Sequence, residues 1–171
     1  LMHELKKLVP GVVFDGVGGP RMESEGLVSL YPMDRLTVMG LVEVVKHLPE
    51  LLSIRHGLKR HFLLQPPDVF IGVDAPDFNL GLEKSLKSSG IPTIHYVSPT
   101  VWAWRPGRVK NIRASIDLML SIFPFEVEFL KSHGVPVSYI GHPMADEIAL
   151  EVDHLAARKN LGIPATARVI A

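Results

Sequence analysis

The sequence feature that most constrains the fold is a Gly-x-Pro triplet that occurs three times, each time between a helix-length segment and a short apolar run. The triplets are Gly90-Ile91-Pro92, Gly134-Val135-Pro136 and Gly162-Ile163-Pro164. A glycine just past the end of a helix can adopt the left-handed backbone that terminates it, and a proline two residues later cannot continue the helix. The repeated triplet therefore predicts three helix-to-strand connections.

Short β-branched and aromatic runs alternate with helix-length segments along the chain. The runs predict strands over 12–17, 69–73, 93–97, 118–123 and 137–140. The segments between them predict helices over 36–47, 50–64, 79–88, 108–114, 126–133 and 154–161. Most of the strand runs are continuously apolar, as expected of strands buried on both faces of a parallel sheet. The fold class is therefore α/β with an open parallel sheet.

Composition excludes several classes of function. Eighteen basic and eighteen acidic side chains in 171 residues give a formal net charge of zero, which argues against a nucleic-acid binder. The chain has no cysteine, so it has no disulfide, thiolate metal site or cysteine nucleophile, and a reducing cytoplasmic setting fits. No apolar run reaches the roughly 18 residues that span a bilayer. The mean hydropathy of +0.22 is nevertheless high.

The two ends of the sequence lead us to expect a fragment that is truncated at both ends. Helical apolar spacing begins at Leu1 without a capping residue before it, and 168–171 reads as a strand that stops in mid-run. A weak boundary near 146–153 divides the chain into a domain over 1–150 and the start of a second unit over 151–171.

Parallel sheets of this kind bind ligands at the carboxyl ends of their strands, so residues that follow each strand are the candidate site. Asp74 directly follows the 69–73 run, where partial desolvation suits a general base. A turn-closing role is equally compatible with Asp74 on the residues alone. Asp77 precedes the 79–88 segment, and we interpret it mainly as a helix N-cap.

Two further strand ends carry candidate binding residues. After the first strand, Gly18 and Gly19 could bring backbone N–H groups close to a phosphate, with Arg21 adding charge, although a plain tight turn is the better-supported interpretation. After 93–97, the loop containing Trp102, Trp104 and neighbouring arginines could hold a sugar ring and a phosphate. The alternative is a packed loop.

Three single residues have a structural interpretation at least as strong as a functional one. His95 lies inside a predicted strand, where a histidine is more often a core residue than a catalyst. Glu126 suits the first turn of its helix through the helix dipole alone. His142, beside a glycine at a strand end, could face the ligand cleft.

The 38–62 segment carries more apolar surface than one core-facing stripe requires, beside basic residues. This pattern is typical of a helix that lies on an anionic membrane surface. The residues expected to contact the membrane are Val38, Leu41, Val45, Lys46, Leu48, Leu52 and Arg55.

Six segments, taken together and in order, closely resemble the lipid-A-disaccharide synthase family. They are 17–22, 38–44, 67–79, 94–99, 101–105 and 140–143. The resemblance implies the amino-terminal, Rossmann-like doubly wound domain of a GT-B glycosyltransferase. It also implies inverting transfer of 2,3-diacylglucosamine from its UDP derivative to 2,3-diacylglucosamine 1-phosphate, with no metal or cofactor.

The resemblance further assigns roles and a location. Asp74 matches the aspartate proposed as the family's general base. Acylated substrates place the enzyme in the cytoplasm, peripherally on the inner face of the inner membrane, in contact with anionic lipid. The sequence does not specify an oligomeric state. The substrate-binding set expected from the motifs is Gly18, Gly19, Arg21, Asp77, Asn79, His95, Ser98, Trp102, Trp104, Arg105 and His142.

Two departures from the family pattern limit what this chain is expected to do. The family's Gly-Glu-x-Ser-Gly-Asp loop would lie before Leu1, and most of the carboxyl-terminal, nucleotide-binding domain would follow Ala171. We therefore expect the 171-residue chain alone to be inactive. Two alternatives stay open: another UDP-sugar GT-B enzyme, such as an epimerase or a peptidoglycan glycosyltransferase, and a non-catalytic nucleotide-binding domain.

Overall fold

The structure, a computed structural model, describes residues 1–36, 41–101 and 106–170. Its amino-terminal part contains α1 (Met2–Leu8), β1 (Asp15–Gly16), α2 (Pro20–Glu23), β2 (Val28–Ser29), the 3₁₀ turn η1 (Met33–Arg35) and α3 (Leu41–Leu64). The central part contains β3 (Phe70–Val73), α4 (Pro76–Lys87), β4 (Thr93–Tyr96), η2 (Pro106–Arg108), α6 (Val109–Ser115), β5 (Leu118–Ser121), α7 (Pro124–Ser132) and β6 (Val137–Tyr139). Two short helices follow, α8 (Met144–Glu147) and α9 (His154–Asn160).

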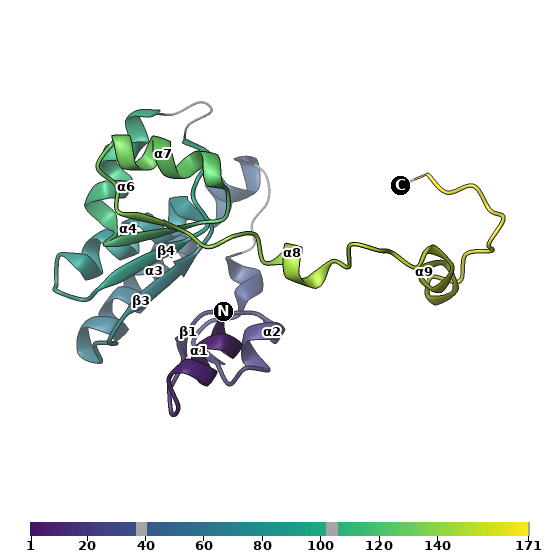
Figure 1. Cartoon of the computed structure of the whole chain (residues 1–171). Helices are drawn as coiled ribbons and strands as arrows, with labels where there is room; N and C mark the ends of the chain where they lie inside the picture. The colour runs from purple at the N-terminus through teal and green to yellow at the C-terminus, as the bar shows by residue number, and fades with distance from the viewer. Residues whose placement is uncertain (37–40, 102–105, 171) are drawn as a thin grey trace.

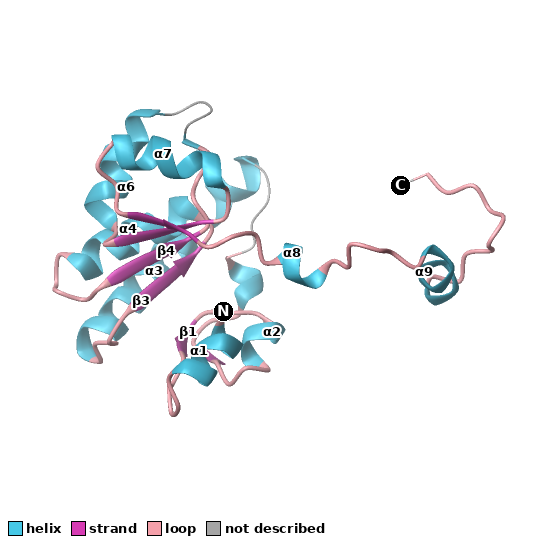
Figure 2. Cartoon of the chain, in the orientation of Figure 1, coloured by secondary structure: helices cyan, strands magenta, loops and turns pink. Residues whose placement is uncertain are grey.

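A four-stranded parallel sheet forms the centre of the molecule (Figure 2). Its strands lie in the order β3-β4-β5-β6, with Gly72 opposite His95 and Tyr96 opposite Leu120. The α/β fold with parallel strands and alternating helices is confirmed. These four strands run across the sheet in sequence order, so the reversal of order that defines a doubly wound sheet does not fall among them.

The Gly-x-Pro triplets end helices in the way the sequence predicts. Gly90 and Gly134 have φ of +85° and +71°. The N–H of Ile91 donates to the Leu86 carbonyl at 3.1 Å, and the N–H of Val135 donates to the Leu130 carbonyl at 3.0 Å. All four of these apolar side chains are buried, so each helix end is closed by a Schellman motif with its usual apolar contact.

The prolines of the first two triplets lead directly into the next strand, whereas no strand follows Pro164 in the described residues, so the third predicted helix-to-strand connection is wrong. The carbonyl of Pro92 accepts a hydrogen bond from Phe70 N–H at 2.9 Å, and that of Pro136 accepts one from Met119 N–H at 2.8 Å. The proline carbonyl is thus the first acceptor of the next parallel ladder, although its own nitrogen cannot donate.

Helices cover one face of the sheet, and the alternation of burial along each strand identifies that face. In β4, Thr93 and His95 are completely buried, whereas Ile94 and Tyr96 are only partly buried. His95 contacts Glu83 of α4, so the buried side chains are those on the helix side. Helices α4, α6 and α7 are gathered there beside the strands (Figure 2).

The core consists of two apolar clusters. One lies among α4, α6, α7 and the sheet, and the other lies between α3 and α4. The first comprises Leu80, Val101, Val109, Ile112, Ile116, Met119, Leu130 and Val135. The second comprises Ile54, Leu58, Phe62, Leu82, Leu86 and Ile91.

The amino-terminal region differs most from the sequence-based prediction. The strand expected over 12–17 is reduced to the two residues of β1, which pairs in parallel with β2 in a separate small sheet. The strand β2 was not predicted from the sequence. Gly16, with φ of +154°, and the Gly18-Gly19 turn limit the length of β1. Val17 and Tyr31 pack against the α3–α4 cluster, which attaches this region to the main body.

The helices expected over 36–47 and 50–64 meet in one helix, α3, which is described from Leu41 to Leu64 with Pro49 inside it; residues 37–40 lie outside the described residues. A proline removes one backbone hydrogen bond from a helix interior and often breaks the helix. Here Ile54, Leu58 and Phe62 anchor the segment after Pro49 against α4, which favours continuation.

The chain beyond β6 leaves the main body as an extended segment that carries α8 and α9 (Figure 1). Asp153 caps α9 by accepting hydrogen bonds from the N–H groups of Leu155 and Ala156. No strand forms over 168–170, because that segment has no neighbouring strand to pair with in the described part of the chain. The domain boundary near 146–153 stays a prediction. No helix in the described ranges is long and apolar enough to span a membrane.

Candidate functional site

A pocket of about 310 Å³ lies at the carboxyl ends of β3, β4 and β5. This is the edge at which parallel α/β sheets bind ligands. The pocket brings together three residues predicted from the sequence, Asp74, Asp77 and Ser98. The other lining residues are Pro76, Val97, Pro99, Thr100, Val101, Arg108, Phe123 and Glu126.

Asp74 is held in a tight turn between β3 and α4. Asp74 and Ala75 have φ of +50° and +42°, a left-handed backbone that is uncommon for residues with a side chain. The Asn79 side-chain amide donates to the Asp74 carbonyl at 2.8 Å, and Asp74 N–H donates to the Tyr96 carbonyl at 2.9 Å. The Asp74 side chain is exposed, so the partial desolvation expected from the sequence is not present in this chain.

Asp77 does not cap α4, contrary to the sequence interpretation. The helix begins at Pro76, with Ala75 at the N-cap position and no side-chain cap bond. Asp77 lies in the first turn and pairs with the Arg108 guanidinium across the pocket. Proline at the first helical position explains the earlier start, because its missing N–H costs nothing there.

The end of β4 contributes a second unusual turn. Val97 has φ of +77°. Ser98 is 6% exposed, and its hydroxyl donates to the Pro99 carbonyl at 3.3 Å. Left-handed backbone at Asp74, Ala75 and Val97 is concentrated at one end of the sheet. Such conformations cost free energy and are common at ligand sites.

Glu126 lines the pocket, although a structural role in the helix was the only one predicted for it from the sequence. Helix α7 starts at Pro124, and Glu126 in its first turn is almost completely buried. The Ser121 hydroxyl at the end of β5 donates to its Oε2 at 2.7 Å. Its position after a strand end was a signal for the pocket, but a dipole interaction alone was enough to explain the residue.

His142 lies beside the pocket rather than in its lining. Its ring centroid is 5.8 Å from that of Phe123, a pocket residue. Its Nδ1 accepts a hydrogen bond from Met144 N–H at 3.2 Å. This bond turns the chain into α8, so the structure gives His142 a local role in the turn.

His95 is not accessible to a substrate, which corrects its assignment as a binding residue. Its side chain is completely buried, and Nδ1 lies 2.7 Å from Oε1 of Glu83, which is also completely buried. Glu83 was not among the residues predicted from the sequence. The available signal was an acidic residue between Leu82 and Leu86 on the buried side of α4.

The glycine-rich turn over 18–21 lies in the amino-terminal region and does not line this pocket. Gly18 is buried, and its N–H donates to the Ser29 hydroxyl at 3.2 Å, so that donor is already used. A Cβ on Gly18 would lie 2.5 Å from a Leu27 methyl, so close packing accounts for the glycine. Gly19 caps α2, and Arg21 is exposed on that helix.

Several predicted residues lie outside the described residues. These are Trp102, Trp104 and Arg105 of the proposed binding loop and Val38 of the proposed membrane segment. Leu41, Val45 and Lys46 belong to α3, but their side chains are not described. Among the residues that are described, no group of three His, Asp or Glu side chains could hold a metal ion.

The fold and the site define a class of protein: a parallel α/β protein with a carboxylate-bearing pocket at the carboxyl edge of its sheet. A model of the lipid-A-disaccharide synthetase family matches residues 1–171, and the chain belongs to this family. Similar proteins include the lipid-A-disaccharide synthases of Chromohalobacter salexigens and Pseudomonas aeruginosa strain UCBPP-PA14, each 56% identical over the whole chain. The Cellvibrio japonicus synthase is 54% identical over the same length. The chain spans 44%, 45% and 44% of these three relatives.

Proposed function

We propose that the chain is the acceptor-side part of a lipid-A-disaccharide synthase with GT-B architecture. Residues 1–150 would form the Rossmann-like domain, and 151–171 would begin the nucleotide-binding domain. The observation that carries this proposal is Asp74 in a pocket at the carboxyl edge of the sheet, in a chain whose whole length matches the family.

In the proposed reaction, the Asp74 carboxylate accepts the proton of the acceptor hydroxyl of 2,3-diacylglucosamine 1-phosphate. The hydroxyl oxygen forms a bond to the anomeric carbon of UDP-2,3-diacylglucosamine as the bond to UDP breaks, with inversion. One carboxylate base suffices, because UDP is a good leaving group and needs charge stabilisation more than an acid. The remaining candidate substrate contacts, from the motifs, are Gly18, Gly19, Arg21, Asp77, Asn79, Ser98, Trp102, Trp104, Arg105 and His142.

The test uses a protein that carries this chain together with the remaining length of its relatives. Asp74→Asn should lower kcat for UDP release at least about 100-fold, the usual contribution of a general base, with little change in KM. Glu128→Gln, an exposed carboxylate-to-amide change on α7, is the matched control and should keep full turnover. Full turnover by Asp74→Asn would remove the base assignment.

Acceptor choice separates the proposal from its alternatives. The intact protein should form disaccharide only with the acylated glucosamine phosphate. Turnover with a peptidoglycan precursor or epimerisation of UDP-N-acetylglucosamine instead would identify another GT-B enzyme. The 171-residue chain alone should form no disaccharide.

We further propose that α3 contacts an anionic membrane surface on the cytoplasmic side of the inner membrane. Leu48 and Leu52, one helical turn apart, are 46% and 44% exposed. Replacing both with serine should reduce flotation of the chain with anionic vesicles, because burying the exposed part of each leucine contributes on the order of 1 kcal/mol. Unchanged flotation would contradict this contact.

A further inference from the structure

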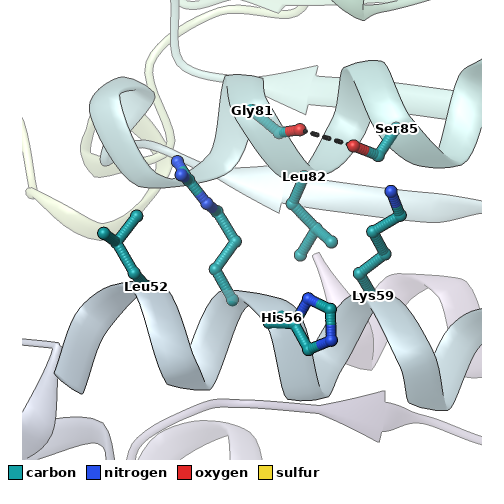
Figure 3. Close-up of a pocket in the computed structure, with 7 residues that line it drawn as sticks. Leu52, His56, Lys59, Gly81, Leu82 and Ser85 are labelled. Carbon is teal, nitrogen blue, oxygen red and sulfur yellow. Dashed lines mark hydrogen bonds between the residues drawn. The ribbon is translucent and has the colours of Figure 1, made fainter. Parts of the chain in front are cut away.

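A second pocket, of about 300 Å³, lies between α3 and α4, away from the strand-end pocket. It is lined by Leu52, Arg55, His56, Lys59, Gly81, Leu82 and Ser85 (Figure 3). The net charge of the whole chain is zero, yet this lining contains three basic residues and no acidic one. Such a segregation of charge favours an anionic ligand.

The basic groups of this pocket are available to a ligand. In the described ranges, the side chains of Arg55, His56 and Lys59 have no ion pair or hydrogen bond. The acidic residues of α4 are engaged elsewhere. Glu83 faces the sheet and contacts His95, and Asp77 pairs with Arg108. The Ser85 hydroxyl donates to the Gly81 carbonyl at 3.1 Å (Figure 3). The remaining side-chain donors of the lining are those of the three basic residues.

Gly81 makes room for this arrangement. A Cβ at Gly81 would lie 2.8 Å from Nη1 of Arg55, so the guanidinium occupies the space where a side chain on α4 would stand. Arg55 and Lys59 are half-buried and one helical turn apart. A planar guanidinium and an ammonium on one wall of a concave site are the groups that proteins use to bind phosphate oxygens.

Exposed leucines continue the same stripe of α3 toward its amino-terminal end. Leu48, Leu52, Arg55 and Lys59 follow the spacing of one helix face, and Leu52 is itself a wall of the pocket. A water-soluble phosphate ester would leave both leucines exposed. A ligand that carries a phosphate next to hydrocarbon would satisfy the basic and the apolar residues together.

We infer that this pocket binds the phosphodiester of an anionic phospholipid, with Arg55 and Lys59 holding the phosphate and Leu48 and Leu52 contacting the acyl chains. The inference rests on the membrane contact proposed above and adds a defined headgroup site to it.

The first experiment measures flotation of the 171-residue chain with vesicles of phosphatidylcholine containing phosphatidylglycerol. The double variant Arg55→Gln/Lys59→Gln should lower the partition constant at least tenfold. Arg60→Gln/Lys84→Gln is the matched control, because it removes the same charge from exposed residues of the same two helices outside the pocket. An equal loss in the control would show general charge attraction and overturn the site.

A second variant keeps every charge. Gly81→Leu fills the space that Arg55 occupies, and it replaces glycine inside a helix with a better helix former. It should weaken vesicle binding at least fivefold while circular dichroism shows the same helix content. Unchanged vesicle binding by a folded Gly81→Leu protein would overturn the pocket.

The second experiment titrates inorganic phosphate and follows the backbone amide NMR signals of Gly81 and Leu82, which line the pocket and are present in the wild type and in the double variant. Saturable shifts in the wild type, absent from the double variant, support the anion site, and no shifts overturn it. Leu48→Ser/Leu52→Ser should lose vesicle binding but keep the phosphate shifts. If phosphate causes shifts but the wild type does not float with the vesicles, the phospholipid is excluded as the ligand and the membrane contact of α3 is excluded with it. If the wild type and both charge variants float equally, the membrane contact of α3 is supported, but the headgroup site at Arg55 and Lys59 is excluded.

Discussion

Glu83 Oε1 and His95 Nδ1 are 2.7 Å apart in a hydrogen-bonded pair between α4 and β4, and neither side chain has any exposed surface. Among the described residues, Glu83 Oε2 and His95 Nε2 have no hydrogen-bond partner. The pair joins the helix that follows Asp74 to the strand that precedes Ser98. It therefore fixes the relative position of two elements that form the strand-end pocket.

The Glu83–His95 pair should show strong energetic coupling. Glu83→Leu or His95→Leu alone should lower the free energy of unfolding by about 3 kcal/mol, because each leaves a buried polar group without its partner. The double variant should lose less than the sum, since an apolar pair needs no partner. Urea denaturation of the four proteins measures this coupling. Simple additivity would show that the two side chains do not depend on each other.

Gly72→Ala should destabilise the chain by disturbing this pair. A Cβ at Gly72 would lie 2.1 Å from Glu83 Oε1 and 3.2 Å from the Cβ of Asn79. The clash should cost about 1–3 kcal/mol, the usual range for overpacking a core. Gly107→Ala is the control, because no atom lies within 4 Å of its Cβ position. Thermal unfolding compares the two, and equal melting temperatures would contradict the close packing.

Gly90→Ala should cost about 1–2 kcal/mol through backbone strain alone. Gly90 has φ of +85°, and no atom lies within 4 Å of its Cβ position, so an added methyl group meets no neighbour. Gly107→Ala again serves as control, since Gly107 also has open space but no positive φ. Urea denaturation should separate the two variants. If Gly90→Ala leaves the free energy of unfolding unchanged, the left-handed backbone at this helix end is not required.

Acid should weaken the link between α4 and β5 through Asp117. Partial burial would raise the pKa of Asp117, but hydrogen bonds from Thr93 N–H at 2.9 Å and from Lys87 outweigh burial, and the pKa falls below its usual 3.8. A lowered folded-state pKa stabilises the fold above the unfolded pKa of about 3.9. That stability is lost as pH falls through the folded-state value.

Asp117→Asn should therefore reduce the free energy of unfolding by about 1 kcal/mol at pH 7, and by less at pH 3 and below. Asp68→Asn is the control, because Asp68 is exposed and has no ion pair among the described residues. Urea denaturation from pH 7 to pH 2.5 tests the difference. Equal loss at both ends of the range would exclude this pH dependence.

The candidate site could be predicted only in part, because strand ends are local features and side-chain partners are not. Asp74 and Ser98 follow apolar runs, so their position at the carboxyl edge could be predicted from the sequence. The side-chain partners of Asp77 and His95 could not be predicted in this way. Arg108 lies 31 residues after Asp77, and Glu83 lies 12 residues before His95.

The sequence by itself determined the alternation of helices and strands, because the Gly-x-Pro triplets and the apolar runs act through local backbone conformation. It also determined the edge of the sheet at which the site lies. The tertiary structure decided which charged side chains form pairs and which stay unpaired. The packing of α3 on α4 leaves Arg55 and Lys59 over Gly81, and the packing of α4 on the sheet encloses Glu83 with His95. Both outcomes depend on contacts between residues that are far apart in the sequence. Local backbone preferences do not specify such contacts.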